Sequence, residues 1–326
     1  IIYMMEILSN KCKIFIVGDL EDNEFNRKYS ENFYKINIGD NNYSNDKKNS
    51  KIIYLENLTG SDLCTFLNKS KLLFGPHGTT SNIARFLNTR IFDFFEKNNF
   101  ELLLIGGWQR LIPEIILNKL KIGGIGFHGS SELLPKGRGR STVNWSLIRG
   151  KTQFILHAFL MTPGVDDGDI IAHEIFDINQ WDTCKTINYK FSIIQKRILE
   201  EIIPKLLSND FKHIPQTGEP SYYPKRTPDD GLIDWSKPVY EIYNFIRALT
   251  RPYPGAFTYV KAQRLNIWES QPFDSKIKYE DTNGRIVEKF STGHFVVKCK
   301  DGLLLITDYD GKVAPRDILG EPYNDK

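Results

Sequence analysis

The chain has 326 residues, a formal net charge of +3, and 40% hydrophobic and 25% charged residues. This length allows two hydrophobic cores, so we expect two domains. The small charge does not suggest a nucleic-acid-binding surface, and we expect no nucleic acid partner. The four cysteines form no CxxC pair, which argues against a zinc site or a disulfide framework and favours a reducing compartment. Residues 1–8 are too short and too broken for a signal peptide or a membrane span, so we expect a cytoplasmic protein without a membrane partner.

The first hundred residues alternate short strand and helix patterns. Buried-strand patterns are predicted at residues 13–19, 51–55 and 71–75. Residues 19–51 are rich in Asn, Lys and Asp, and we expect a loop-rich segment there. A small-residue loop over 76–82 leads into a helical pattern; it could bind an anion, but an ordinary capped turn is favoured.

From residue 100 the pattern becomes sharper. Strands are predicted at 101–108, 123–127, 154–161 and 170–176, and helices at 111–120, 144–149 and 183–207. The last helix is long and amphipathic. Strands alternating with helices predict an α/β fold with a Rossmann-like parallel sheet.

A Pro- and Gly-containing segment near residues 208–224 then separates the α/β pattern from a C-terminal part with a different pattern. Beyond it we expect a helix over 238–249 and short strands at 256–260, 265–269, 285–290, 294–298 and 303–309. Asp301-Gly302 predicts a hairpin between the last two, and five short strands predict a small, mostly β, OB-like domain. The predicted organisation is a catalytic domain over 1–207, a linker over 208–224 and a C-terminal domain over 225–326.

A histidine and an acidic turn follow two of the predicted strands. His128 comes directly after the Gly-rich strand, and Asp166 lies in the turn Gly164-Val165-Asp166-Asp167-Gly168-Asp169. Open α/β sheets place their chemistry at strand ends, which favours a functional His128 over a structural one. A carboxylate beside an imidazole fixes its tautomer and favours its protonated form. Spacing alone does not decide which of the three aspartates faces inward, and a solvated turn is the alternative.

Two further segments are candidate ligand contacts. Lys136-Gly137-Arg138-Gly139-Arg140 carries three cations that could bind a pyrophosphate or a carboxylate, or could simply form a solvated basic loop. Gly106-Gly107-Trp108 could admit a flat ligand, or Trp108 could be an ordinary core residue. No metal site is indicated, because the acidic turn lacks the ligand spacing of a calcium loop.

These motifs together resemble a known family. The run His128-Gly129-Ser130-x-x-Leu133-Leu134-Pro135, followed by Arg138-Gly139 and by Val165-Asp166-Asp167-Gly168-Asp169, resembles the signature of the folate-dependent formyltransferases. The C-terminal domain of the tRNA and sugar-nucleotide members of this family is resembled by three further segments, at residues 226–235, 246–249 and 251–257. The resemblance covers residues from about 100 to 310. It is closest to the sugar-nucleotide N-formyltransferases, especially the formyltransferase half of the bifunctional 4-amino-arabinose enzyme, and residues 1–95 match the family poorly.

The resemblance implies a formyltransferase that uses N10-formyltetrahydrofolate as co-substrate and no metal. It implies catalytic roles for His128 and Asp166. It implies folate-side contacts at Gly107, Trp108, Leu111, Ile112, Pro113, Thr162, Gly164, Val165, Asp167 and Gly168. Substrate contacts are expected at Lys136, Arg138, Arg140 and Asn144. The family's catalytic Asn is replaced by Gly126, so Ser130 or a backbone N–H would have to supply the missing oxyanion donor.

The resemblance further implies an acceptor that is a nucleotide-linked amino sugar used for surface polysaccharide, and a homodimer. Two alternatives stay open. One is formylation of methionyl-tRNA, which would need an extended basic surface. The other is a non-catalytic relative that binds folate or a nucleotide sugar, motivated by Gly126.

Overall fold

The structure is a computed structural model. It describes residues 14–17, 34–37, 52–56, 72–74, 101–105, 111–274, 276–277 and 279–320, with side chains from residue 101 onwards. The chain forms two compact units, each built from three segments. The first unit comprises Ile1–His128, Leu156–Glu174 and Ile194–Gly218, and the second comprises Gly129–Ile155, Ile175–Ile193 and Glu219–Lys326.

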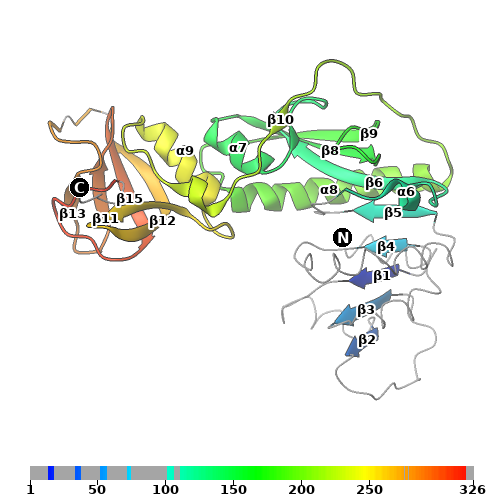
Figure 1. Ribbon diagram of the computed structural model, residues 1–326, viewed down its shortest axis with the longest axis horizontal. Helices are drawn as coiled ribbons and strands as arrows, with labels where there is room; N and C mark the ends of the chain where they lie inside the picture. Colours follow the sequence, from blue (N-terminus) through cyan, green and yellow to red (C-terminus); the bar gives the residue numbers. More distant parts are fainter. Residues whose placement is uncertain are drawn as a thin grey trace. The chain divides into compact units, whose positions relative to one another are not determined.

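An eight-stranded sheet is the main feature of the α/β part, in the order β2-β3-β1-β4-β5-β6-β8-β9 (Figure 1). The pairs from β2 to β6 are parallel, which confirms the predicted Rossmann-like sheet. The strands are β1 (Ile14–Val17), β2 (Tyr34–Asn37), β3 (Ile52–Glu56), β4 (Leu72–Phe74), β5 (Leu102–Ile105), β6 (Gly123–Ser130), β8 (Gln153–Leu160) and β9 (Ile170–Asp177). The expectation of a loop over 19–51 was wrong at β2, a four-residue edge strand too short to stand out among its polar neighbours.

Burial explains why these segments become strands. The central residues of β8, from Phe154 to Phe159, are buried throughout, as expected for a strand covered on both faces. β9 lies at the sheet edge and is mostly open to solvent, with Glu174 and Ile175 on alternate faces.

The helices of this part differ in length from their predicted spans. α6 covers only Glu114–Leu117, because the amides of Lys119 and Leu120 bond three residues back and tighten the last turn. α7 spans Thr142–Ile148, and α8 spans Cys184–Leu207. In the part of the chain that the structure describes, no helix combines the length and apolarity needed to cross a bilayer.

The C-terminal part of the second unit is an antiparallel sheet of five strands, in the order β11-β12-β15-β14-β13, with α9 (Val239–Leu249). Its strands are β11 (Ala256–Val260), β12 (Gln263–Asp274), β13 (Ile286–Lys289), β14 (Phe295–Lys298) and β15 (Leu303–Asp310). β14 pairs with β15 as the predicted hairpin. Ile318 bridges to Arg285 and Gly320 to Tyr259, so the C-terminal segment bonds at both sheet edges and gives the barrel-like closure expected from sequence.

Candidate active site

His128 belongs to β6 and sits two residues before its end. The predicted strand ends at residue 127, but β6 runs to Ser130 and His128 is only 7% exposed. Gly129 explains part of the difference: a Cβ there would lie 2.3 Å from the ring of Phe154, so only glycine allows that ring to cover the strand. The imidazole is therefore held in a largely water-excluded position.

Asp166 is the aspartate of the acidic turn that contacts this histidine. Its Oδ2 lies 3.3 Å from His128 Nδ1, and its side chain is 22% exposed. Asp166 adopts a left-handed backbone conformation, with φ of 50°. The neighbouring Asp167 accepts a hydrogen bond from the hydroxyl of Thr162 instead. Asp169 lies 3.7 Å from His213. The turn thus separates three carboxylates into three environments.

Glycines make this turn compact. A Cβ at Gly168 would lie 1.7 Å from the backbone oxygen of Leu160, so no other residue fits without a backbone shift. A Cβ at Gly164 would lie 1.9 Å from the Asp167 carboxylate. The close return of the chain brings Asp169 O to the amide of Leu160, at 2.9 Å. The compact backbone positions the Asp166 carboxylate.

Gln216 supports the turn from outside, and sequence reasoning missed it. Its Nε2 donates to the backbone oxygens of Asp166 at 2.8 Å and Gly168 at 2.7 Å. The segment around it is docked by two backbone hydrogen bonds between Ile170 and Ile214. Residues 208–224 were expected only as a linker, and a single glutamine there carries no sequence signal for this contact.

His157 is a second buried histidine that the sequence did not single out. It lies on β8 with no exposed surface, and its Nδ1–H donates to the backbone oxygen of His128 at 3.2 Å. Burial lowers the pKa of His157 to about 4, so the ring is neutral at neutral pH. Its ring lies 6.0 Å from that of His173. A histidine inside an apolar segment is typical of a core residue, so no pattern in the sequence indicated this contact. In the structure, the hydrogen bond from His157 helps to orient the strand that carries His128.

The basic loop belongs to the second unit. β7 (Arg138–Gly139) pairs in parallel with β10 (Tyr222–Tyr223). Arg138 is 8% exposed, with one guanidinium nitrogen 3.3 Å from the Tyr222 hydroxyl, whereas Lys136 and Arg140 are exposed. Gly139 has φ of 100°, and a Cβ there would lie 2.6 Å from the Tyr223 oxygen. The backbone of the basic loop is therefore fixed by its pairing with β10, unlike that of a freely solvated basic segment.

Two other predicted residues of the second unit have their polar groups engaged. Ser130 is fully buried, and its Oγ accepts a hydrogen bond from the amide of Glu132 at 3.3 Å. Asn144 is 3% exposed and donates to the backbone oxygen of Ala248 at 2.6 Å, which ties α7 to α9. The Asn144 amide therefore has a structural task.

Comparisons with known proteins agree with this architecture. The formyl transferase model matches residues 71–203, and the model of the formyl transferase C-terminal domain matches residues 225–314. The chain belongs to the formyl transferase family. The resemblance seen in the motifs is thereby confirmed, and the members that it resembles transfer formyl groups from folate.

Individual relatives show how much of the chain is shared. The bifunctional polymyxin resistance protein ArnA of Wigglesworthia glossinidia brevipalpis is 35% identical over 216 residues, or 65% of this chain. The chain spans 32% of the length of that relative. HypX from Aquifex aeolicus, solved with tetrahydrofolic acid, is 17% identical with a TM-score of 0.54 and covers 93% of this chain and 44% of its own. An N-formyltransferase from Helicobacter canadensis, solved with folinic acid and dTDP-3-aminofucose, is 18% identical with a TM-score of 0.54, over 91% of this chain and 99% of its own. At these identities the two solved structures support the fold alone.

The segment that the resemblance predicts to contact folate is described in part. Gly107 and Trp108 lie outside the described residues. Ile112 is buried, while Leu111 is 56% exposed, and Pro113 precedes the first turn of α6. Across the first unit, Val165 of the acidic turn is also 41% exposed. The described part of the unit thus presents apolar side chains to solvent at residues expected to meet a folate.

Gly126 is the position at which the resemblance predicts that the family's asparagine is missing. A Cβ at this position would lie 2.9 Å from the ring of Phe159 and 3.2 Å from Met161. The space beside β6 is therefore filled from β8, and an asparagine side chain has no room there without repacking. The loss of the asparagine is built into the packing of the sheet.

Proposed function

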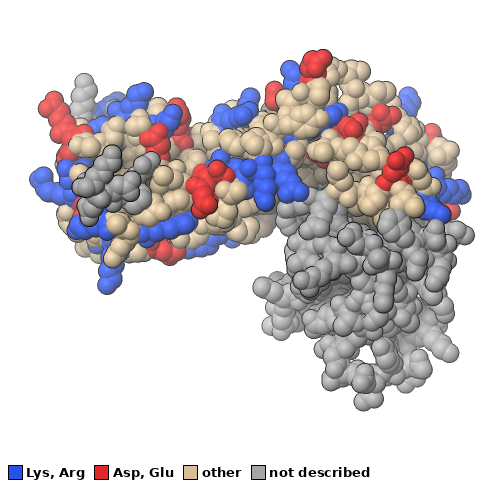
Figure 2. Space-filling view, viewed as in Figure 1, with Lys and Arg blue, Asp and Glu red and all other residues tan. Residues whose placement is uncertain are grey.

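We propose that the protein is a sugar-nucleotide N-formyltransferase, which moves the formyl group of N10-formyltetrahydrofolate to the amine of a nucleotide-linked amino sugar. The observation that carries the reaction is the buried His128–Asp166 contact at the end of β6. The acceptor class is supported by the relatives, which include ArnA and an N-formyltransferase solved with dTDP-3-aminofucose. On the face shown in Figure 2, basic side chains of the described residues gather near the middle of the view, with acidic ones beside and around them. The small formal net charge of +3 favours this acceptor over tRNA.

His128 is the proposed stabiliser of negative charge. With Nδ1 donating to Asp166, Nε2 is the ring nitrogen that can bind a second proton. The imidazolium is stabilised by the adjacent carboxylate and can donate a hydrogen bond to the oxyanion that forms when the amine adds to the formyl carbon. Asp166, directly or through water, would take the proton that the amine releases. When the oxyanion collapses, the bond between the formyl carbon and N10 breaks, and N10 would leave with that proton as the amine of tetrahydrofolate. A largely buried site strengthens each of these interactions.

Residues of the first unit would hold the co-substrate, whose bound form supplies the formyl group. A flat pterin needs apolar surface and a backbone that it can approach closely. Leu111 and Val165 offer exposed apolar side chains, and Gly164 and Gly168 keep the acidic turn free of side-chain bulk. We propose that the folate is held by the described residues Leu111, Ile112, Pro113, Thr162, Gly164, Val165, Asp167 and Gly168, together with Gly107 and Trp108.

The phosphates of the acceptor would be held by the basic loop. Lys136 and Arg140 are exposed, and Arg138 is fixed by the β7–β10 pair, an arrangement suited to charge-assisted contacts with a diphosphate. Asn144 remains a proposed substrate contact of this loop region, with its Nδ2 donating to the backbone oxygen of Ala248.

Ser130 and backbone N–H groups are the proposed substitutes for the family's asparagine. The hydroxyl of Ser130 accepts from Glu132, which leaves its own proton available for donation. Ser130→Ala separates the two options: a large loss of rate assigns the role to the hydroxyl, and a small one assigns it to the backbone.

The test is formyl transfer itself. The purified chain is incubated with N10-formyltetrahydrofolate and dTDP-, UDP- and GDP-linked 3- and 4-amino sugars, with methionyl-tRNA as the competing acceptor, and products are identified by the mass of one added formyl group. His128→Asn should lower the rate by about a hundred- to a thousandfold, whereas His294→Asn, a histidine of the second unit, should not. Formylation of the tRNA alone would overturn the acceptor class, and ligand binding without any product would identify a non-catalytic relative.

A further inference from the structure

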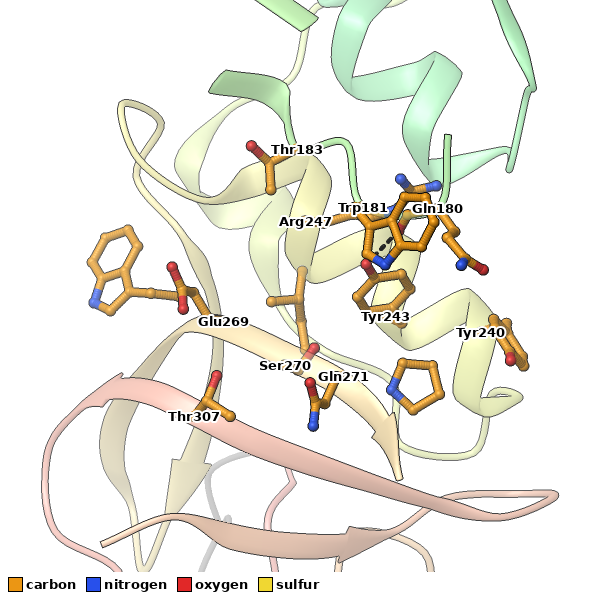
Figure 3. Close-up of a pocket in the computed structure, with 13 residues that line it drawn as sticks. Gln180, Trp181, Thr183, Tyr240, Tyr243, Arg247, Glu269, Ser270, Gln271 and Thr307 are labelled. Carbon is orange, nitrogen blue, oxygen red and sulfur yellow. Dashed lines mark hydrogen bonds between the residues drawn. The ribbon is translucent and has the colours of Figure 1, made fainter. Parts of the chain in front are cut away.

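A separate pocket opens within the second unit, and the proposed reaction does not use it. It lies between α9, β12 and the turn that precedes α8, and its volume is about 420 Å³ (Figure 3). This volume is within the range of pockets that bind small molecules.

Aromatic rings form one part of the lining. Trp181 comes from the turn before α8, and Tyr240 and Tyr243 come from α9. Trp181 is 73% exposed and Tyr240 is 63% exposed, which is a costly position for large rings unless something covers them. Tyr243 is fixed, because its hydroxyl donates to the backbone oxygen of Gln180 at 2.5 Å. The rings therefore offer flat apolar faces around a preformed cavity.

Hydrogen-bonding groups without partners form another part of the lining. The carboxylate of Glu269 and the amide of Gln271 make no hydrogen bond or ion pair with any described residue. The hydroxyl of Ser270, between them on β12, is buried and has no partner among the described residues. Buried polar groups normally have a partner, so an unpaired hydroxyl in a pocket wall points to a ligand or to ordered water.

Arg247 supplies a fixed donor at the same pocket. Its Nη1 donates to the backbone oxygens of Asn179 at 2.9 Å and Asp182 at 2.7 Å, and its Nε donates to Asn244 at 2.8 Å. Nη2 has no partner within the described part of the chain. The guanidinium is thus held rigidly with one donor group left for a ligand.

The charge of the pocket lining limits the chemical class of ligand that can bind. Among the described residues that line the pocket, Arg247 is the one cation and Glu269 the one carboxylate, so the wall has no net charge. A nucleotide or another phosphate would need more positive charge. A pyranose ring meets all the conditions, because its C–H face packs on an aromatic ring and its hydroxyls both donate and accept hydrogen bonds.

We propose that this pocket is a second, non-catalytic saccharide site that binds a neutral pyranose against Trp181 and Tyr240. Glu269, Gln271 and Ser270 hydrogen-bond the ring hydroxyls, and Arg247 Nη2 donates to one of them. The proposal goes beyond formyl transfer and does not depend on it, because binding at this site requires neither folate nor an amine.

The experiment is saturation-transfer NMR of the full chain with the methyl pyranosides of glucose, galactose, N-acetylglucosamine and arabinose as probes. At least one glycoside should bind, and Trp181→Ala and Glu269→Gln should each weaken it on the order of tenfold, the loss expected from one ring face or one charge-assisted contact. The control is Tyr189→Ala, which removes a ring of α8 that is 58% exposed and does not line the pocket.

Three results would overturn the proposal. They are the absence of binding by every glycoside, binding that Trp181→Ala and Glu269→Gln leave unchanged, and tighter binding of free UMP at the same residues. Because Trp181 and Glu269 are exposed, the variants should keep the circular dichroism spectrum of the parent chain. Formyl transfer by these variants is measured in parallel and should be unchanged, so failure of the proposed reaction and failure of this site are told apart.

Discussion

Gln216 is expected to hold the catalytic turn in its active geometry. Gln216→Ala removes two hydrogen bonds, to the backbone oxygens of Asp166 at 2.8 Å and Gly168 at 2.7 Å. Each amide–carbonyl bond contributes about 0.5–1.5 kcal/mol net, so the pair holds the turn by about 1–3 kcal/mol. That free energy corresponds to a change of about 5- to 150-fold in the population of the ordered turn. Because Asp166 has a positive φ, the turn depends on such support.

Two measurements test this reasoning. Hydrogen exchange of the amides over 162–168 should accelerate in Gln216→Ala, and kcat/KM for formyl transfer should fall, while the melting temperature changes little. Gln216→Glu should behave in the same way, because a carboxylate cannot donate to a carbonyl oxygen. Gln153→Ala, at an exposed glutamine where β8 begins, is the matched control. Unchanged exchange in the turn of Gln216→Ala would refute the argument, whatever the activity of the protein.

Three further predictions concern buried positions of the described chain. Gly126→Asn should lower the free energy of unfolding by about 1–3 kcal/mol, because its Cβ would lie 2.9 Å from the Phe159 ring. In urea titrations, Phe159→Leu should lower the free energy of unfolding by less in the Gly126→Asn chain than in the parent chain. Losses that simply add in the double variant would contradict this. Stability should fall as the pH drops from about 6.5 to 4, because burial lowers the pKa of His157 to about 4 and the unfolded chain then binds the additional proton. The full effect is at most about 3 kcal/mol, and His157→Asn should show a weaker pH dependence between pH 7 and pH 5. The Cys184 thiol donates to Thr250 at 3.2 Å, and burial raises its pKa to about 12, so iodoacetamide should modify it only after unfolding, as peptide mass mapping would show.

The glycine at position 126 bears most directly on how this chain differs from its family. Phe159 and Met161 occupy the space beside it, so an asparagine at this position would require the neighbouring side chains to repack. A chain that is active with this packing would rely on His128 and a substitute donor for charge stabilisation. A chain that is inactive would still have kept the His128–Asp166 contact. The rate of the parent chain relative to His128→Asn separates these cases.

Local patterns in the sequence determined much of the architecture. The continuous apolar run of β8 predicts a buried strand because a strand covered on both faces needs apolar residues throughout. The Asp301-Gly302 turn predicts the β14–β15 hairpin because such pairs adopt the tight turns that join antiparallel strands. The motif around His128 and the acidic turn indicated the family. These signals are readable because each depends on residues close together in the chain.

Only the tertiary structure decided which groups act together. Three aspartates in one turn are equivalent in sequence, and the folded backbone brings Asp166 alone to His128. Gln216 reaches that turn from a segment 50 residues further along the chain. The contact of the Asn144 amide with Ala248 and the contact of His157 with the backbone of His128 appear only in the folded chain. These contacts join residues far apart in sequence, where no periodicity or spacing rule carries information, so packing in three dimensions determines them.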